Sequence, residues 1–382
     1  MVIVHFFAIR SIQNRGLRWV CAELFPAPRL FQCSDQLFKF LADSYSASVA
    51  RVDSKHQKVL RYIEIATPIE EIQQFLEELG WIQNEQVLKI QTPGEGNMNV
   101  VLQVITDKRS FILKQSRPYV NKYQQIAAPL ERILTEYAFY QATQGSILDQ
   151  SIPEMLAFSP ENYLMMLRYI EDFEDMTSLY AARKIGQDEL KQLVTMATTI
   201  HASEVPADYP ENMILRQLNH QHIFVLPFQE DNGFELNDVQ AGLQDLSQDF
   251  KTDQSLKAVI DAIGQKYLRP GTTLLHGDYY PGSWIRAKGK MFIIDTEFSF
   301  AGFPEFDLGV MVAHLIMVTA DRTYLDQVLN LSPDTVDRQL VGQVAGIEIA
   351  RRLIGLAQLP LSRTLEEKEH LLNMSRQLIL SS

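Results

Sequence analysis

The sequence predicts an α+β fold of two unlike lobes, a small antiparallel β-sheet lobe followed by a mostly helical lobe. Three observations predict it. A length of 382 residues allows about two domains. Short β-rich runs without a helical period fill much of the region from Val87 to Tyr169. After Asp188 the apolar residues recur at helical spacing, and no repeat of fixed period runs through the chain.

Composition and charge exclude several classes of protein. Hydrophobic residues make up 46% and charged residues 21% of the chain, as in ordinary globular proteins, which excludes wholesale disorder. A formal net charge of −12 offers no positive field for a phosphate backbone, so nucleic acid is not an expected partner. Two cysteines exclude a disulfide framework and a structural zinc site. The apolar stretches are shorter than the roughly 20 residues that cross a bilayer, so no membrane contact is expected.

Residues 1–62 are predicted to be an irregular or poorly ordered N-terminal extension. The polar stretch from Asp43 to Lys58 shows no sustained period. The first residues place no charged region ahead of an apolar one, so a secretory signal is not expected. We assign no chemistry to this extension.

The first lobe, predicted to span residues 63–168, begins with a helix. Thr67 is expected to cap this helix through its hydroxyl, with Pro68 at the first helical position and Gly80 at the end. Strands are predicted at 87–90, 99–105, 111–114 and 163–169, and a second helix at 130–143.

The second lobe, predicted to span residues 169–382, is mostly helical. Helices are predicted from 188 onward, at 239–250, at 255–268 and from about 324 to the end. A short apolar strand precedes His276, and a second one covers 291–294.

These two apolar strands of the second lobe each end on carboxylates. Asp278 follows the first strand, and Asp295 and Glu297 follow the second. Phosphoryl transfer needs carboxylates in two roles. One carboxylate orients a hydroxyl nucleophile and accepts its proton, and others hold Mg²⁺ on the nucleotide phosphates. We assign Asp278 to the first role and Asp295 with Glu297 to the second. Each residue taken alone also fits an ordinary turn or a solvated position.

Residues that precede these carboxylates in the chain match the nucleotide-binding part of a kinase. Gly94, Gly96 and Asn97 lie between two predicted strands, where glycines let backbone amides approach phosphate oxygens closely. Lys114 follows on the next strand and Glu136 in the next helix, which is the strand-lysine and helix-glutamate pairing of kinase-like lobes. Alone, Lys114 also fits an edge-strand lysine and Glu136 a surface residue. The order of all these parts is more specific than any one of them.

From about residue 63 to its end, the chain resembles the aminoglycoside phosphotransferase and choline kinase superfamily, and within it most resembles the 5-methylthioribose kinases. The glycine loop, Lys114, Glu136, the His-Gly-Asp and Asp-x-Glu motifs and the segment Arg351–Ala357 carry the resemblance. It implies a protein-kinase-like two-lobed fold that uses ATP and Mg²⁺ on a small-molecule hydroxyl acceptor. A cytoplasmic location is expected, because ATP is available there and thiols stay reduced. A homodimer stays open.

The resemblance extends to metal and anion sites. Ser283 stands where most of the superfamily has a metal-binding Asn, as in the methylthioribose kinases. Arg351 and Arg352 interrupt an apolar run, which favours an anion site over a solvated face or a helix-dipole contact. Family members use this pair near the sugar and the transferring phosphate.

Other residues of the second lobe are assigned supporting roles. His276 is expected to orient the loop and not to act as the base. Asp307 is most simply a helix cap, and the resemblance implies that it also braces the loop that holds Asp278. Tyr280, like Tyr279 and Trp284, either lines the acceptor pocket or packs.

Three functions compete. The first is an ATP-dependent kinase acting on 5-methylthioribose or a similar sugar-like acceptor. The second is a kinase of the same superfamily with an aminoglycoside, amino-alcohol or homoserine-type acceptor, because Tyr279-Tyr280-Pro281 replaces the Leu-His-Thr of the methylthioribose kinases. A cationic acceptor needs an acidic pocket, so the charge around Asp278 separates these two. The third is a catalytically dead nucleotide-binding protein, although no lysine, base or metal ligand is missing from the motifs.

Overall fold

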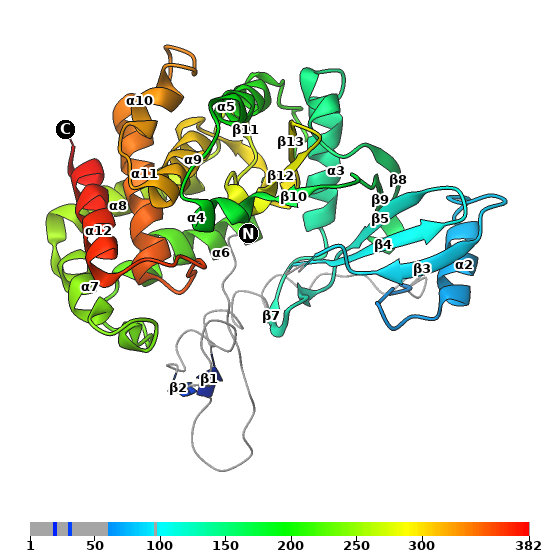
Figure 1. Cartoon of the computed structure of the whole chain (residues 1–382), viewed down its shortest axis with the longest axis horizontal. Helices are drawn as coiled ribbons and strands as arrows, with labels where there is room; N and C mark the ends of the chain where they lie inside the picture. Colours follow the sequence, from blue (N-terminus) through cyan, green and yellow to red (C-terminus); the bar gives the residue numbers. More distant parts are fainter. Residues whose placement is uncertain (1–17, 21–29, 33–59, 95–97, 382) are drawn as a thin grey trace.

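The computed structural model describes residues 18–20, 30–32, 60–94 and 98–381. The predicted N-terminal extension therefore lies largely outside the described residues. Within it, β1 (Arg18–Val20) and β2 (Leu30–Gln32) pair antiparallel. The boundaries of the two lobes stay predictions, although Figure 1 shows a sheet-rich part and a helical part, with α3 (Arg132–Thr143) beside the sheet.

The first lobe is built on a five-stranded antiparallel sheet in the order β3-β4-β5-β9-β8. Its strands are β3 (Val87–Gln91), β4 (Val100–Thr106), β5 (Ser110–Gln115), β9 (Leu164–Arg168) and β8 (Met155–Ser159). The helix α2 (Ile69–Glu78) buries Ile72, Phe75 and Leu76 in one apolar cluster with Phe111 and Leu113 of β5. Because side chains alternate along a strand, Ile112 and Lys114 of β5 face the other side.

The start of α2 differs from the prediction. Thr67 does not cap the helix, because its hydroxyl accepts a hydrogen bond from the Glu64 N–H at 2.8 Å. Pro68 is the N-cap instead, and its carbonyl accepts from Glu71 and Ile72. The predicted end is confirmed, since Gly80 follows the helix with a positive φ of 69°.

The second lobe packs helices around the long buried helix α9 (Figure 1). The helices of this lobe are α4 (Leu179–Ala182), α5 (Gln187–Ala202), α6 (Met213–His220), α7 (Leu243–Thr252), α8 (Gln254–Leu268), α9 (Glu305–Thr319), α10 (Tyr324–Leu329), α11 (Arg338–Ile354) and α12 (Leu365–Leu380). Helix α7 begins later than predicted, because a short 3₁₀ turn occupies Leu236–Asp238 and Gly242 has a positive φ of 88°.

Short strands of the second lobe hold the predicted carboxylate loops. β11 (Thr273–Leu275) pairs with β14 (Phe300–Gly302), and β12 (Trp284–Ala287) pairs with both β10 (Glu174–Asp175) and β13 (Lys290–Ile293). The predicted α+β class, an antiparallel sheet plus a helical region in two lobes, is confirmed.

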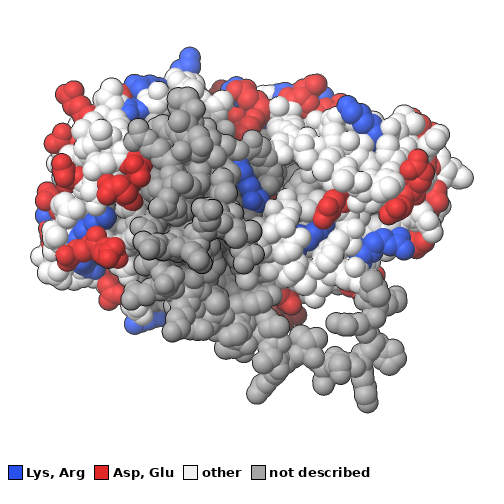
Figure 2. All heavy atoms as spheres, turned by 90° about the horizontal axis from the view of Figure 1, so that it is seen from below, with Lys and Arg blue, Asp and Glu red and all other residues white. Residues whose placement is uncertain are grey.

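One face of the molecule carries mixed charge. On the face seen in Figure 2, Lys and Arg side chains are interspersed with Asp and Glu side chains. Within the described ranges, none of the helices combines the length and the apolar character that a membrane span requires.

Candidate active site

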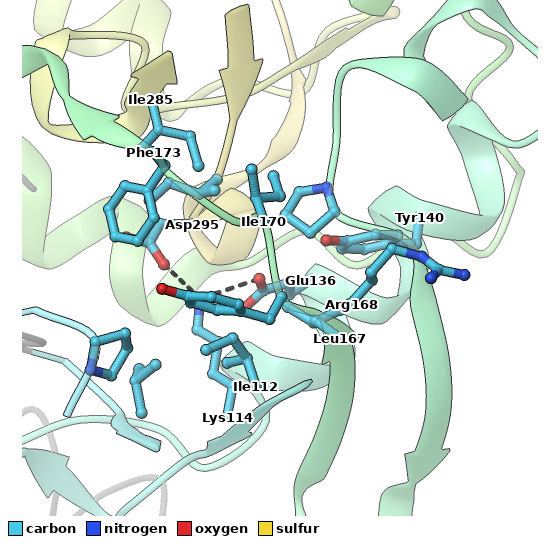
Figure 3. A pocket seen from close by; sticks show the side chains of 15 residues that line it. Ile112, Lys114, Glu136, Tyr140, Leu167, Arg168, Ile170, Phe173, Ile285 and Asp295 are labelled. Atoms are coloured by element: carbon cyan, nitrogen blue, oxygen red, sulfur yellow. Dashed lines mark hydrogen bonds and ion pairs between the residues drawn. The ribbon is translucent and has the colours of Figure 1, made fainter. Parts of the chain in front are cut away.

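The structure brings Lys114, Glu136 and Asp295 together from three separate elements (Figure 3). The Lys114 Nζ lies 3.0 Å from Glu136 Oε1, 2.8 Å from Glu136 Oε2 and 2.7 Å from Asp295 Oδ1. The side chains of Lys114 and Glu136 are 4% and 2% exposed, whereas that of Asp295 is 43% exposed. The buried pair therefore holds a carboxylate that still faces open space.

The charges of this triad stabilise one another. Burial by itself lowers the pKa of Lys114, but the carboxylates of Asp295 and Glu136 outweigh burial and raise it. Burial raises the pKa of Glu136 to about 7 against the opposing charge of Lys114. Burial also tends to raise the pKa of Asp295, but the charge and hydrogen bond of Lys114 prevail and lower it. Lys114 is thus a cation and Asp295 an anion at neutral pH.

Two residues of the site have left-handed backbone conformations. Asp295 has φ 62° and ψ 51°, a region that non-glycine residues adopt rarely. Gly277 has φ 80°, and a Cβ there would lie 2.1 Å from the Phe298 carbonyl oxygen. Such conformations cluster at functional sites, where the surrounding structure maintains them.

Asp307 binds the loop that carries Asp278. Its Oδ2 accepts from the His276 N–H at 2.7 Å, and its Oδ1 accepts from the Gly277 N–H at 3.0 Å. The prediction that Asp307 caps a helix is wrong. Helix α9 already begins at Glu305 with Pro304 as its N-cap, and the Asp307 carboxylate in its first turn is bonded to the loop amides instead.

His276 joins the two carboxylate loops. Its Nδ1 accepts from the Asp278 N–H at 3.3 Å, and its Nε2 donates to the Ile294 carbonyl at 3.0 Å. Burial lowers the pKa of His276, so the ring is neutral. With both nitrogens bonded to backbone, the imidazole orients Asp278 relative to Asp295.

Asp278 itself is 2% exposed, and its carbonyl accepts from the Tyr280 N–H at 3.1 Å. Ser283 is also buried, and its hydroxyl has no hydrogen-bond partner among the described residues. The Ser283 carbonyl accepts from Ile294 at 3.0 Å, which holds this serine close to the strand end that bears Asp295.

Glu297 is buried and bonded to the first lobe. Its Oε2 accepts from Asn99 Nδ2 at 3.0 Å and lies 3.1 Å from Arg132 Nε. Neither Asn99 nor Arg132 lies near Glu297 along the chain, so sequence spacing alone does not predict these contacts.

Arg351 and Arg352 are neither solvated nor free of partners. They are 1% and 2% exposed and share the carboxylate of Glu348, whose Oε1 lies 2.9 Å from Arg351 Nη2 and 2.8 Å from Arg352 Nε. Burial tends to raise the pKa of Glu348, but the two arginines prevail and hold it well below the usual range. Arg351 Nη1 and Arg352 Nη2 have no hydrogen-bond partner among the described residues.

A histidine completes this buried arginine cluster. His314 lies between Tyr180, whose hydroxyl is 2.6 Å from Nδ1, and Glu348, whose Oε1 is 2.9 Å from Nε2. Burial lowers the pKa of His314 to about 3, so the ring is neutral, accepts from Tyr180 and donates to Glu348. With a neutral histidine and one carboxylate for two guanidinium groups, the cluster has a net positive charge.

Of the three predicted aromatic candidates, Tyr280 lies against the arginine cluster. Its ring is 4.9 Å from the Arg352 guanidinium carbon and 4.9 Å from the His314 ring. Tyr279 packs instead, since it is fully buried, donates to the Leu193 carbonyl at 2.7 Å and lies edge-on to Trp284. Tyr280 thus links the Asp278 loop to the arginines.

An apolar cavity of about 120 Å³ lies beside Lys114 (Figure 3). Its lining is mostly apolar, with Lys114, Glu136 and Asp295 among the polar groups, and includes Val101, Ile112, Tyr140, Leu167, Tyr169, Ile170, Phe173, Ile285 and Ile294. A mostly apolar cavity with a few convergent charges is typical of a small-molecule site. It includes residues 167–170, at the predicted boundary between the two lobes.

Other predicted ligand-binding residues are only partly described. Gly94 has open space where a Cβ would stand, and Gly96 and Asn97 lie outside the described residues. No group of three or more His, Cys, Asp or Glu residues gathers as a metal site in the described part of the chain. Mg²⁺ commonly binds one or two carboxylates together with substrate phosphates, so the oxygens of Asp295 and Glu297 fit its chemistry.

Comparison with known proteins assigns the family. The model described as "Phosphotransferase enzyme family" matches residues 89–336, more than half of the chain. The chain belongs to this family. The segments that carry Lys114, Glu136, Asp278 and Asp295 all lie within the match.

Similar curated proteins are methylthioribose kinases. The chain is 26% identical to methylthioribose kinase 1 of Oryza sativa subsp. japonica over 257 residues, which are 60% of this chain and 56% of that protein. It is 22% identical to the methylthioribose kinase of Bacillus cereus (strain G9842) over 357 residues, 80% of this chain and 88% of that protein. The chain thus spans little more than half the length of the rice relative.

Similar solved structures include a choline kinase and an aminoglycoside phosphotransferase. Choline kinase LicA from Streptococcus pneumoniae has a TM-score of 0.47 at 12% identity, covering 82% of this chain and 99% of that one. The ADP-bound aminoglycoside phosphotransferase APH(2'')-Ib has a TM-score of 0.46 at 12% identity, with the same coverage.

Proposed function

We propose that this phosphotransferase-family protein is an ATP-dependent kinase that phosphorylates a hydroxyl group of a small, sugar-like acceptor, 5-methylthioribose or a similar compound. One observation carries the proposal. Lys114 is held between a buried Glu136 and the half-exposed carboxylate of Asp295, beside a mostly apolar cavity. Kinases use this arrangement to bind nucleotide phosphates.

Each residue then has a defined task. Lys114 binds nucleotide phosphates, and Asp278 aligns the acceptor hydroxyl and accepts its proton as the oxygen attacks the γ-phosphorus and ADP leaves. Asp295 and Glu297, with Ser283 near them, are the residues that would hold Mg²⁺, which supplies positive charge to the phosphates when bound. His276 and Asp307 keep the Asp278 loop in place through the hydrogen bonds described above.

The charge around Asp278 favours a sugar-like acceptor over a cationic one. The arginine cluster is net positive, and the charge of Asp278 acts on Arg351. The two guanidinium groups balance the carboxylates of Glu348 and Asp278, so the residues around Asp278 offer no excess of negative charge that would attract a polycationic aminoglycoside or an amino alcohol. The methylthioribose kinases among the relatives support the same choice. A cytoplasmic location and a homodimer stay predictions.

A panel of acceptors tests the function. Purified protein with ATP and Mg²⁺ is given 5-methylthioribose, other pentoses, choline, homoserine and an aminoglycoside, and ADP release is followed. We expect turnover with a sugar. Turnover with the cationic acceptors alone would reject the sugar assignment, and no turnover with any acceptor would favour the catalytically dead alternative.

The variant Asp278→Asn tests the assigned base. General-base catalysis contributes typically 10²–10⁴-fold, so turnover should fall by about that factor while ADP affinity stays near that of the wild type. Asp249→Asn, on the exposed face of α7, is the matched control. Unchanged turnover in Asp278→Asn would mean that another group accepts the proton.

A further inference from the structure

Glu297 is fixed from both lobes. Its backbone belongs to the second lobe, where the Glu297 carbonyl accepts from Asn212 Nδ2 at 2.8 Å. Its side chain is 3% exposed and bonds to the first lobe, through Arg132 Nε at 3.1 Å and Asn99 Nδ2 at 3.0 Å. The carboxylate cannot rotate without breaking charge-assisted hydrogen bonds in a buried place, where such bonds are costly to lose.

Arg132 has no donor nitrogen left for a ligand. Its Nη1 donates to the carbonyls of Arg117 at 2.7 Å and Pro129 at 2.6 Å, and its Nη2 donates to the carbonyl of Met98 at 2.8 Å. Nε is bonded to the Asn99 and Glu297 oxygens. An arginine near a phosphate site commonly binds phosphate, but this one is fully engaged with protein groups. Its contact with the site runs through Glu297.

Asn99 occupies a matching position. Its Oδ1 accepts from Arg132 Nε at 3.0 Å and from the Ser116 hydroxyl at 3.1 Å, so its Nδ2 is directed to Glu297. Both ends of the amide are thus used, and the residue is 2% exposed.

An apolar cluster surrounds the same junction. It contains side chains of the first lobe, Met98, Val120 and Ala128, together with side chains of the second lobe, Phe298, Leu215 and Leu356. Phe298 follows Glu297 directly. The polar contact therefore lies in a packed lobe interface and not at a solvated surface pair, where such contacts contribute little.

We propose that Asn99 and Arg132 are positioning residues that orient the Glu297 carboxylate for the metal-bound nucleotide. This inference rests on the proposed function. Asp295 is the exposed carboxylate and is positioned by Lys114, whereas Glu297 is the buried one and is positioned by Asn99 and Arg132. Loss of the Asn99 contact should weaken the response to Mg²⁺ and not nucleotide binding as such.

The variant Asn99→Asp isolates this contact. Asp keeps the acceptor for Arg132 and Ser116 but replaces the donor to Glu297 with a second carboxylate oxygen. Calorimetry of ADP binding, once with Mg²⁺ and once with EDTA, provides a measurement independent of turnover. We expect the affinity in Mg²⁺ to fall about tenfold, the effect of losing one hydrogen bond to a charged group, and the affinity in EDTA to stay unchanged. Ser116→Ala removes only the bond to Asn99 Oδ1 and should leave both affinities as in the wild type.

Each outcome is decisive. If both affinities of Asn99→Asp fall equally, or neither falls, the positioning role is rejected. If Asn99→Asp does not fold, Asn99→Ala removes the amide donor to Glu297 without adding a charge, and the same selective loss in Mg²⁺ is expected. A wild-type protein that binds no ADP with Mg²⁺ rejects the proposed function, whereas a wild type that binds and variants that match it reject this inference alone.

Discussion

Replacing Glu348 by Gln should destabilise the protein far more than a surface substitution does. Glu348 is 1% exposed, and its carboxylate is shared by Arg351, Arg352 and His314. Gln keeps the size of the side chain but leaves two guanidinium groups in the interior without a counter-charge. Removing one partner of a buried ion pair costs about 3–5 kcal/mol, and here one carboxylate serves two cations, so we expect a loss of at least about 3 kcal/mol.

Thermal unfolding measures this loss. At roughly 2–4 °C per kcal/mol for a large domain, the melting temperature should fall by about 6–12 °C. Glu369→Gln, at an exposed position of α12, is the matched control and should melt like the wild type. The double variant Glu348→Gln/Arg352→Leu should recover part of the loss, because it removes one uncompensated cation. A Glu348→Gln protein that melts with the control would show that Glu348 does not hold the arginines by charge.

Two further predictions concern the backbone of the Asp278 loop and the buried histidine. Gly277→Ala should lower both the melting temperature and turnover, because its Cβ would meet the Phe298 carbonyl oxygen at 2.1 Å. Gly289 has a similar φ of 77° but open space where a Cβ would lie, so Gly289→Ala measures the cost of the backbone angle alone. Equal losses of melting temperature in the two variants would contradict the clash. His314 has a pKa of about 3 in the folded protein, so its ring stays neutral there. In the unfolded chain the same ring binds a proton as the pH falls below about 6.5. The free energy of unfolding should therefore drop by about 1.4 kcal/mol per pH unit toward pH 4 for this one residue. Denaturant titrations at several pH values should show a shallower slope in His314→Gln, and an unchanged slope would assign the acid sensitivity to other groups.

The fold was predictable where local pattern and tertiary packing agree. Strands β4 and β5 are short runs rich in apolar and β-branched residues on either side of a turn, so residue type and spacing alone identify them. The hairpin of β6 (Tyr119–Val120) and β7 (Tyr123–Ala127) was not predicted, because a two-residue strand has no period to detect. Thr67 has the residue type of a helix cap, but its hydroxyl reaches an amide on the preceding turn, which sequence position alone does not reveal.

Some residues of the candidate site could also be predicted from the sequence, and others could not. The motif order predicted that Lys114, Glu136 and Asp295 share one site, and the side chains of these three residues meet, whereas the role of Asp278 stays a prediction. Glu348 was missed, although it precedes Arg351 and Arg352 by three and four residues, the spacing of ion pairs on one helix face. That spacing was the available signal. His314 gave none, because its partners Tyr180 and Glu348 come from distant segments.

The two carboxylates of the Asp-x-Glu motif each contact the first lobe, and they differ in how far they are exposed to solvent. Asp295 reaches Lys114 on β5, and Glu297 reaches Arg132 at the start of α3, so adjacent carboxylates contact separate elements of the first lobe. The left-handed backbone of Asp295 turns the chain so that one carboxylate faces open space, at 43% exposure, and the other is buried, at 3%. A buried carboxylate with fixed partners resists reorientation, whereas the half-exposed Asp295 carboxylate has open space on one side for a ligand. When a ligand binds at this junction, we therefore expect the Asp295 side chain to change its contacts while the contacts of Glu297 stay in place.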